Sequence, residues 1–312
     1  MICYYYLTFN CVCRCEYCPI WQDETLDDSV VPSLSTVERN LASLSSMGFN
    51  KIVFTGGEPF LYEDLKDVLG MSRKKKFRTV LYTNGLLSPK VLPGIAALID
   101  ELYISIDHPM EDEHNRIKGQ ECFSESLDAL SAAKSLGIDP SISFTVTRDS
   151  IRYLPEMLEL AQSKQVKMFI SPVHHYHGLE GLEPISVDYI TRYSKAPGVV
   201  IDDQLMSLIK HGGNDTSRTS CKVLNNSISI SPDDRLFLPC FWNRQASIPI
   251  EGQLEKLLKS DIVRGYRKLQ GTMAFCEGCL AKESIDRSLS GKIKSADITG
   301  NVKRSISYFL KG

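Results

Sequence analysis

The chain has 312 residues, of which ten are cysteine and 43% are hydrophobic, as in an ordinary globular protein. The formal net charge is -2 and no long block of like charge occurs, so nucleic acid is not expected as a partner. The N-terminus lacks the features of a signal sequence and no segment is long and apolar enough to span a bilayer, so we expect a cytoplasmic protein without a membrane partner.

Short β-rich runs alternate with helical patterns through the first two thirds of the chain. The runs are residues 2–8, 51–55, 79–82, 101–106, 141–147 and 166–171. Helical spacing relates Val37, Leu41, Leu44 and Met47, and later Leu154, Leu158 and Ala161. This alternation predicts parallel strands joined by right-handed crossovers, with chemistry at the carboxyl ends of the strands. Six units are two short of a closed eightfold barrel.

Three cysteines follow the first predicted strand, at Cys11, Cys15 and Cys18. Their spacing on a short loop lets three thiolates reach three corners of an iron–sulfur cube and leaves one iron open for another ligand. Zinc is the alternative, because cysteine-rich loops also bind zinc, usually through four ligands. Cys13 lies inside the loop and is an alternative to Cys11, but we interpret it as a bystander.

The second predicted strand ends in Gly56, Gly57, Glu58 and Pro59. Together with the cysteine loop, this segment resembles the radical S-adenosylmethionine (SAM) enzymes. The resemblance implies a partial (β/α)6 barrel of the TIM type, in agreement with the strand count. It also implies a [4Fe–4S] cluster whose fourth iron chelates SAM, and a Gly-Gly-Glu-Pro segment that binds the SAM amino group.

Polar side chains at the ends of the next strands complete the SAM site that the resemblance implies. They are Thr83, Asn84, Ser105, Asp107, Ser143, Thr145 and Arg148. For Thr83 and Ser105 the alternative is a strand-end capping role, and of the last three only one is needed to bind a carboxylate. A stretch around His114 resembles a recurring family motif, with Asn115 where aspartate is usual.

Three histidines follow the sixth predicted strand, at His174, His175 and His177. We expect one of them to act in catalysis, either by contacting the substrate or by accepting the proton released on oxidation, because imidazole titrates near neutral pH. The alternative is a polar loop whose rings only satisfy backbone groups.

The alternation fades near Pro197, and we predict a barrel over residues 1–210 and a small α+β domain with a C-terminal helix over 211–312. The second domain contains Cys221, Cys240, Cys276 and Cys279 and a hairpin with strands 228–231 and 236–239. Four thiolates can close a second [4Fe–4S] cluster completely, and a structural zinc is the alternative. The arrangement resembles the auxiliary-cluster module called twitch, the shortened form of SPASM.

The whole layout resembles radical SAM alcohol dehydrogenases of aminoglycoside assembly. It implies an oxidoreductase in which an external donor such as flavodoxin or ferredoxin reduces the first cluster, and SAM cleavage yields a 5′-deoxyadenosyl radical that abstracts hydrogen from a small-molecule substrate. The auxiliary cluster then accepts an electron. The basic residues 73–76 read as a helix end, or alternatively as a docking patch for the donor.

Three other functions stay open. The first is peptide epimerisation or crosslinking, which we rank below a small-molecule reaction because the barrel begins almost at Met1. The second is nucleotide cyclisation of the molybdopterin-precursor type, which uses only three cysteines at its auxiliary site. The third is a non-catalytic iron–sulfur or zinc protein, which would not need the Gly-Gly-Glu-Pro segment.

Overall fold

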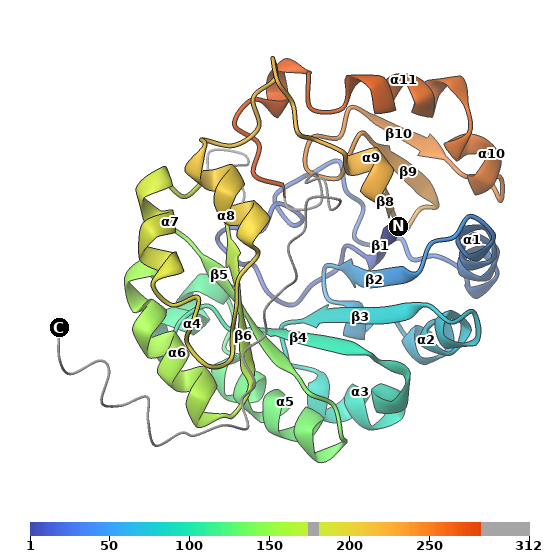
Figure 1. Ribbon diagram of the computed structural model, residues 1–312. Helices are drawn as coiled ribbons and strands as arrows, with labels where there is room; N and C mark the ends of the chain where they lie inside the picture. Colours follow the sequence, from blue (N-terminus) through green and yellow to red (C-terminus); the bar gives the residue numbers. More distant parts are fainter. Residues whose placement is uncertain (174–180, 282–312) are drawn as a thin grey trace.

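The computed structural model describes residues 1–173 and 181–281. A curved sheet forms the centre of the molecule, and helices cover its outer side (Figure 1). The six predicted runs are strands β1 (Ile2–Thr8), β2 (Lys51–Gly56), β3 (Arg78–Thr83), β4 (Glu101–Ser105), β5 (Ser141–Val146) and β6 (Lys167–Pro172). The covering helices are α1 (Leu34–Ser46), α2 (Leu65–Lys74), α3 (Ser88–Ile95), α4 (Glu111–Lys118), α5 (Phe123–Ser135) and α6 (Leu154–Ser163).

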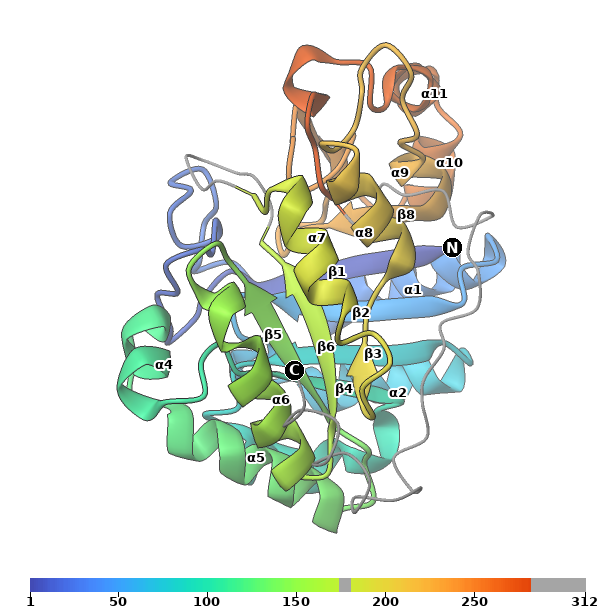
Figure 2. The ribbon, with the colours of Figure 1, turned by 60° about the vertical axis from the view of Figure 1, so that its left-hand side comes forward.

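Strands β1 to β6 lie side by side in chain order, and each pairs in parallel with the next. After α7 (Pro184–Thr191), the two-residue strand β7 (Val199–Val200) adds to β6 in parallel, and α8 (Asp203–Lys210) follows. In the described part of the chain the sheet ends at β7 on one side and at β10 on the other, without closing (Figure 2). The predicted partial barrel is therefore confirmed.

The apolar stripes predicted for two helices face the sheet. Val37, Leu41 and Leu44 of α1 are completely buried, and the predicted face of α6 is buried in the same way. Helix α1 begins at Leu34, three residues before its predicted apolar pattern, because the Ser33 side chain accepts a hydrogen bond from Thr36 N and caps the first turn. These buried faces belong to a large hydrophobic core, which holds the strand ends in fixed positions.

The last third of the described chain extends the same sheet. It contains α9 (Val223–Asn226), β8 (Ser227–Ile230), β9 (Arg235–Leu238), β10 (Ala246–Pro249), α10 (Leu254–Leu258) and α11 (Asp261–Leu269). The predicted hairpin is β8–β9, antiparallel, with each strand one residue earlier than expected. Strand β8 pairs in parallel with β1, so the sheet continues across the boundary proposed at residue 210.

The basic residues 73–76 lie at the C-terminal end of helix α2, as predicted. Arg73 pairs with Asp100 at 3.2 Å, just before β4 begins. These basic residues therefore lie at the amino ends of the strands, whereas the cysteine loop follows the carboxyl end of β1. That separation weighs against residues 73–76 as the docking site of an electron donor to the loop.

Across residues 1–173 and 181–281, no helix combines the length and the apolar character that a membrane crossing requires.

Candidate functional site

The loop after β1 presents three of its four cysteines to the surface. Cys11, Cys15 and Cys18 are partly exposed, whereas Cys13 is only 2% exposed. A hydrogen bond from Cys18 N to Cys15 O, at 3.0 Å, closes a turn between the second and third cysteines. This difference in exposure supports the prediction that Cys13 is a bystander.

The end of β2 is packed directly against the start of the cysteine loop. Gly57 N donates to Thr8 O at 2.7 Å, and Glu58 N donates to Asn10 O at 2.8 Å. A Cβ on Gly56 would lie 2.0 Å from Thr8 O, and one on Gly57 would lie 2.1 Å from Asn10 O. Only glycine permits this approach of two backbones, so the two glycines fix the position of the loop.

The Glu58 side chain joins the ends of β2 and β3. Its buried carboxylate accepts hydrogen bonds from Phe60 N at 3.1 Å, Thr83 Oγ1 at 2.8 Å and Asn84 N at 2.9 Å. Burial raises the pKa of Glu58 to about 7, against the effect of these donors. The buried side chains of Glu58 and Thr83 thus hold the ends of β2 and β3 together. Pro59 begins the 3-10 turn Pro59–Leu61 that follows.

The raised pKa of Glu58 predicts a pH-dependent stability of the apoprotein. The folded state holds a proton on Glu58 up to about pH 7, whereas the unfolded state loses it near 4.5, the ordinary pKa of a glutamate side chain. The free energy of unfolding should therefore fall by up to about 3 kcal/mol as the pH rises from 4.5 to 7, and this contribution should level off above that. Urea denaturation of the wild type and of Glu58→Gln between pH 5 and 8 measures it. Equal slopes for the two proteins would contradict the prediction.

Asn84, at the end of β3, approaches the cysteine loop. Its Nδ2 atom lies 3.9 Å from Cys11 Sγ, and its Oδ1 atom accepts a hydrogen bond from Leu86 N at 3.0 Å. An amide donor directed at a ligand sulfur tunes the electronic properties of a metal centre. The structure thus brings Cys11, Glu58, Thr83 and Asn84 together, as the sequence predicts.

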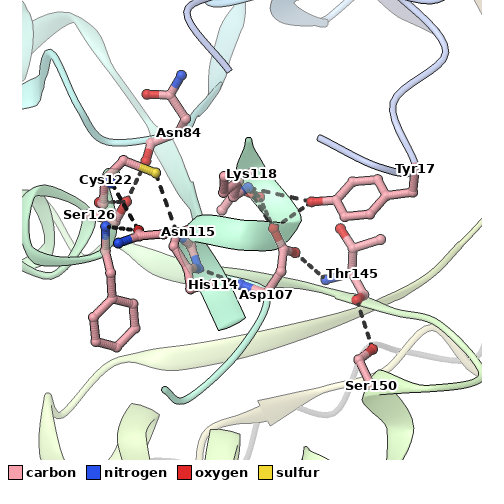
Figure 3. A network of polar contacts seen from close by, with 12 residues as sticks. Tyr17, Asn84, Asp107, His114, Asn115, Lys118, Cys122, Ser126, Thr145 and Ser150 are labelled. Carbon is pink, nitrogen blue, oxygen red and sulfur yellow. Dashed lines mark hydrogen bonds and ion pairs between the residues drawn. The ribbon is translucent and has the colours of Figure 1, made fainter. Parts of the chain in front are cut away.

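The polar residues predicted at the end of β4 belong to a buried network (Figure 3). Lys118 Nζ lies 2.6 Å from Asp107 Oδ2 and 2.6 Å from Ser105 Oγ, and Tyr17 Oη donates to Asp107 Oδ2 at 2.5 Å. Burial opposes both charges, but each charge stabilises the other, so the pKa of Asp107 is lowered and that of Lys118 is raised well above its usual range. Ser105 and Asp107 therefore face protein partners here.

Two of the three residues predicted on and after β5 lie beside this network. Thr145 N donates to Asp107 Oδ1 at 3.0 Å, and Ser143 O accepts a hydrogen bond from Ile106 N at 3.2 Å. The Arg148 guanidinium instead contacts the segment before α7, with Glu183 at 3.4 Å and Gly181 O at 3.2 Å. His174, His175 and His177 lie outside the residues that the structure describes.

The second cysteine set surrounds a single pocket. Its lining includes Cys221, Cys240, Cys276 and Cys279 together with Asn214, Val223, Pro239, Asn243, Gly271 and Ala281. Backbone N–H groups already face two of the sulfurs, from Asn243 to Cys240 and from Ala281 to Cys279, each at 3.4 Å. Such donors stabilise thiolates, so the lining suits a group bound by negative sulfur ligands.

Among the residues that the structure describes, no three cysteine, histidine or carboxylate side chains converge on one metal ion.

Asn214 holds the second pocket together. Its Nδ2 atom donates to Gly271 O at 2.7 Å and to Cys276 O at 3.1 Å, and its Oδ1 atom accepts from Thr219 Oγ1 at 2.7 Å. We expect Asn214→Ala to destabilise the fold by on the order of 2–3 kcal/mol, because it leaves buried polar atoms without partners. If the second cysteine set binds the predicted cluster, its iron should be lost in this variant, while iron at the first set stays. Iron analysis and thermal unfolding test this, and equal loss from both sites would contradict it.

The fold and the first site define an open α/β barrel with a thiol-rich loop at the carboxyl ends of its strands. Residues 5–161 match the model of the Radical SAM superfamily, and the chain belongs to that superfamily. Membership implies a [4Fe–4S] cluster and SAM. The first cysteine set fits a [4Fe–4S] cluster with SAM, because its three partly exposed thiols would supply three ligands and leave the fourth iron for SAM.

Relatives and solved structures of similar fold act on different substrates. The chain is 32% identical over 162 residues to a probable GTP 3',8-cyclase of Thermoplasma volcanium, and the matched region covers 51% of this chain and 49% of that protein. It is 27% identical over 162 residues to an AdoMet-dependent heme synthase of Oleidesulfovibrio alaskensis, covering 50% and 41%. The crystal structure of Streptococcus suis SuiB bound to precursor peptide SuiA has a similar fold, with a TM-score of 0.70, 15% identity and coverage of 91% and 70%. The chain thus spans about half the length of the curated relatives it matches, or less.

Sequence reasoning missed several residues that organise the two sites. Tyr17 and Lys118 bind Asp107, and Asn214 crosslinks the second pocket. A lysine near the end of a helix gives no signal of burial. The structure explains why asparagine can stand at position 115, where aspartate is usual in the family motif. Asn115 Oδ1 caps α5 by accepting hydrogen bonds from Cys122 N and Phe123 N, as an aspartate would.

Proposed function

We propose that the chain is a radical SAM oxidoreductase that oxidises a small molecule such as an alcohol, with a second [4Fe–4S] cluster in a twitch-type domain as electron acceptor. The observation that carries the proposal is the single pocket lined by all four C-terminal cysteines. Four protein ligands leave no iron of that cluster open for the substrate. Its role is therefore electron transfer.

Packing between the two cysteine sets supports this role. Tyr6 stacks on Phe241 at a centroid distance of 4.6 Å and contacts Phe9 at 5.7 Å. Phe9 lies two residues before Cys11, and Phe241 follows Cys240 directly. A continuous aromatic cluster thus connects the surroundings of both sites.

A polar contact reinforces the same interface. Arg244 binds Asp23 at 2.8 Å and Thr25 Oγ1 at 2.7 Å, and its guanidinium stacks over Phe237 at 4.8 Å from the ring centroid. The segment after Cys18 is therefore fixed to the segment after Cys240, which favours a defined distance between the sites.

Oxidation of an alcohol to a carbonyl removes two hydrogens. When bound, the first cluster and SAM supply the radical chemistry that takes the first as a hydrogen atom. The substrate then loses one electron, for which the second cysteine set provides an acceptor, and one proton. The proposed proton acceptor is one of His174, His175 and His177. The barrel's contribution is to orient the substrate and exclude water.

Cyclisation of a nucleotide is the second candidate. It is favoured by the 32% identity to the probable GTP 3',8-cyclase over the barrel half. The four cysteines around the second pocket weigh against it, because an open iron there would require a ligand set of three. Peptide modification is supported by similarity of fold alone, to structures that include SuiB with its precursor peptide.

Anaerobic reconstitution tests the proposal. The protein should bind about eight irons per chain, and after reduction with dithionite it should release methionine from SAM. GTP should give no cyclised product. Binding of about four irons, or conversion of GTP, would overturn the assignment of an electron-transferring second cluster.

A further inference from the structure

The cysteine loop rests on the C-terminal end of α4. Arg14 N donates to Lys118 O at 2.8 Å, and Glu16 N donates to Ile117 O at 3.0 Å. Gly119 ends the helix in the left-handed conformation, at φ 62°, and a Cβ there would lie 3.0 Å from Arg14 O. The backbone between Cys11 and Cys18 is thus fixed to one helix end.

A side chain of the loop makes a further contact beneath it. Tyr17 stands between Cys15 and Cys18, and its hydroxyl donates to Asp107 Oδ2 at 2.5 Å (Figure 3). Asp107 follows β4, so this hydrogen bond ties the loop to the sheet as well as to α4.

The position of Asp107 depends on Lys118. The two side chains are 1% and 2% exposed and form an ion pair at 2.6 Å. The ammonium also lies 2.6 Å from Ser105 Oγ and 3.4 Å from Tyr17 Oη, which gives its three protons three oxygen acceptors. Lys118 therefore has no donor left for a substrate or a cofactor.

A buried ion pair is weak support for stability, because desolvation offsets the attraction, and its best-attested use is to fix register. We propose that Lys118 is a positioning residue for the cluster-binding loop, acting through Asp107 and Tyr17. The proposal rests on Cys11, Cys15 and Cys18 as cluster ligands. Lys118 and Asp107 hold the thiolates in the spacing that retains iron, and the balance of their charges contributes to the reduction potential of the first cluster.

The same sheet offers a matched control at the other end of β4. Tyr103 Oη donates to Glu101 Oε2 at 2.9 Å, and Lys51 Nζ pairs with Glu101 Oε1 at 3.0 Å. This group also combines a tyrosine, a carboxylate and a lysine, with Arg78 as a further partner of Glu101 Oε1 at 2.6 Å, and it lies at the amino end of the strand, away from the cysteine loop.

The experiment compares Tyr17→Phe with Tyr103→Phe, and Lys118→Met with Lys51→Met, in the anaerobically reconstituted protein. Release of iron to a ferrous chelator and the midpoint potential of the first cluster are measured. Tyr17→Phe should release iron roughly three- to tenfold faster, because one hydrogen bond to a charged group is lost. Lys118→Met should release it more than tenfold faster and shift the potential to more negative values, because the Asp107 charge is left unbalanced. The two control variants should stay within about twofold of the wild type.

Tyr17→Phe keeps the ion pair intact, so it tests the proposal even if Lys118→Met does not fold. Iron release from Tyr17→Phe that equals release from Tyr103→Phe would overturn the positioning role, as would an unchanged potential in folded Lys118→Met. A wild-type protein that binds no iron at the first site would instead overturn the ligand assignment itself.

Discussion

Replacing Cys15 by alanine should abolish the release of methionine from SAM, whereas replacing Cys13 should leave it intact. Cys15 is partly exposed and belongs to the proposed ligand set, while Cys13 is buried beneath the loop. Loss of one of three thiolates leaves the cluster with too few protein ligands, so iron should fall from about eight to about four per chain. Iron analysis and methionine release measure both effects.

The second set provides the complementary variant. Cys276→Ala should also remove about four irons but keep SAM cleavage, because the first site is unaffected. Cys3→Ala, which changes a fully buried thiol of the core, serves as a control for general destabilisation. Retention of SAM cleavage in Cys15→Ala, or its loss in Cys13→Ala, would contradict the assignment of ligands.

Gly57→Ala should weaken SAM binding by roughly five- to 150-fold. The new Cβ would lie 2.1 Å from Asn10 O and 2.6 Å from Phe9 O, and both are backbone atoms that no side-chain rotation can move. Overpacking of this kind costs about 1–3 kcal/mol, and a loss of 1.4 kcal/mol in binding is tenfold in affinity. The strain should displace the start of the cysteine loop, because Glu58 N is bound to Asn10 O. Equilibrium binding of SAM to the reconstituted protein measures it.

Gly70→Ala is the matched control for this substitution. Gly70 lies inside α2, and a Cβ there would meet nothing within 4 Å. Alanine in a helix should raise the free energy of unfolding by about 0.5–1 kcal/mol and leave SAM binding unchanged. Similar SAM affinities for the two alanine variants would show that the close approach at Gly57 is unimportant.

The barrel was predictable because its signals are local. Strand β1 has the bounds expected from its apolar run, and β2 to β6 differ by no more than one residue at either end. The two-residue β7 is too short to show a periodic pattern, and β10 has no buried residue that would give it one. The parallel pairing of β8 with β1 is a contact between distant segments, and a single sequence does not encode such a partner locally.

The candidate site also contains residues that local sequence patterns reveal and residues that only the folded chain brings together. Motif spacing located Cys11, Cys15, Cys18 and the Gly-Gly-Glu-Pro segment, because their chemistry depends on residues close in the sequence. The partners of Asp107 come from Tyr17 and Lys118, which only the folded chain brings together. The sequence places Thr83 at the end of its strand, but only the structure shows that its hydroxyl donates to Glu58, and its role in SAM binding stays a prediction.

The pairing of β1 with β8 has a consequence for biosynthesis. Ile2 lies opposite Ser227, so one edge of the first strand stays unpaired until the ribosome has translated most of the chain. A β-edge flanked by buried residues recruits other strands and promotes aggregation. A recombinant fragment that contains the barrel without β8 would therefore expose an unpaired strand edge, and it should aggregate more readily than the full chain.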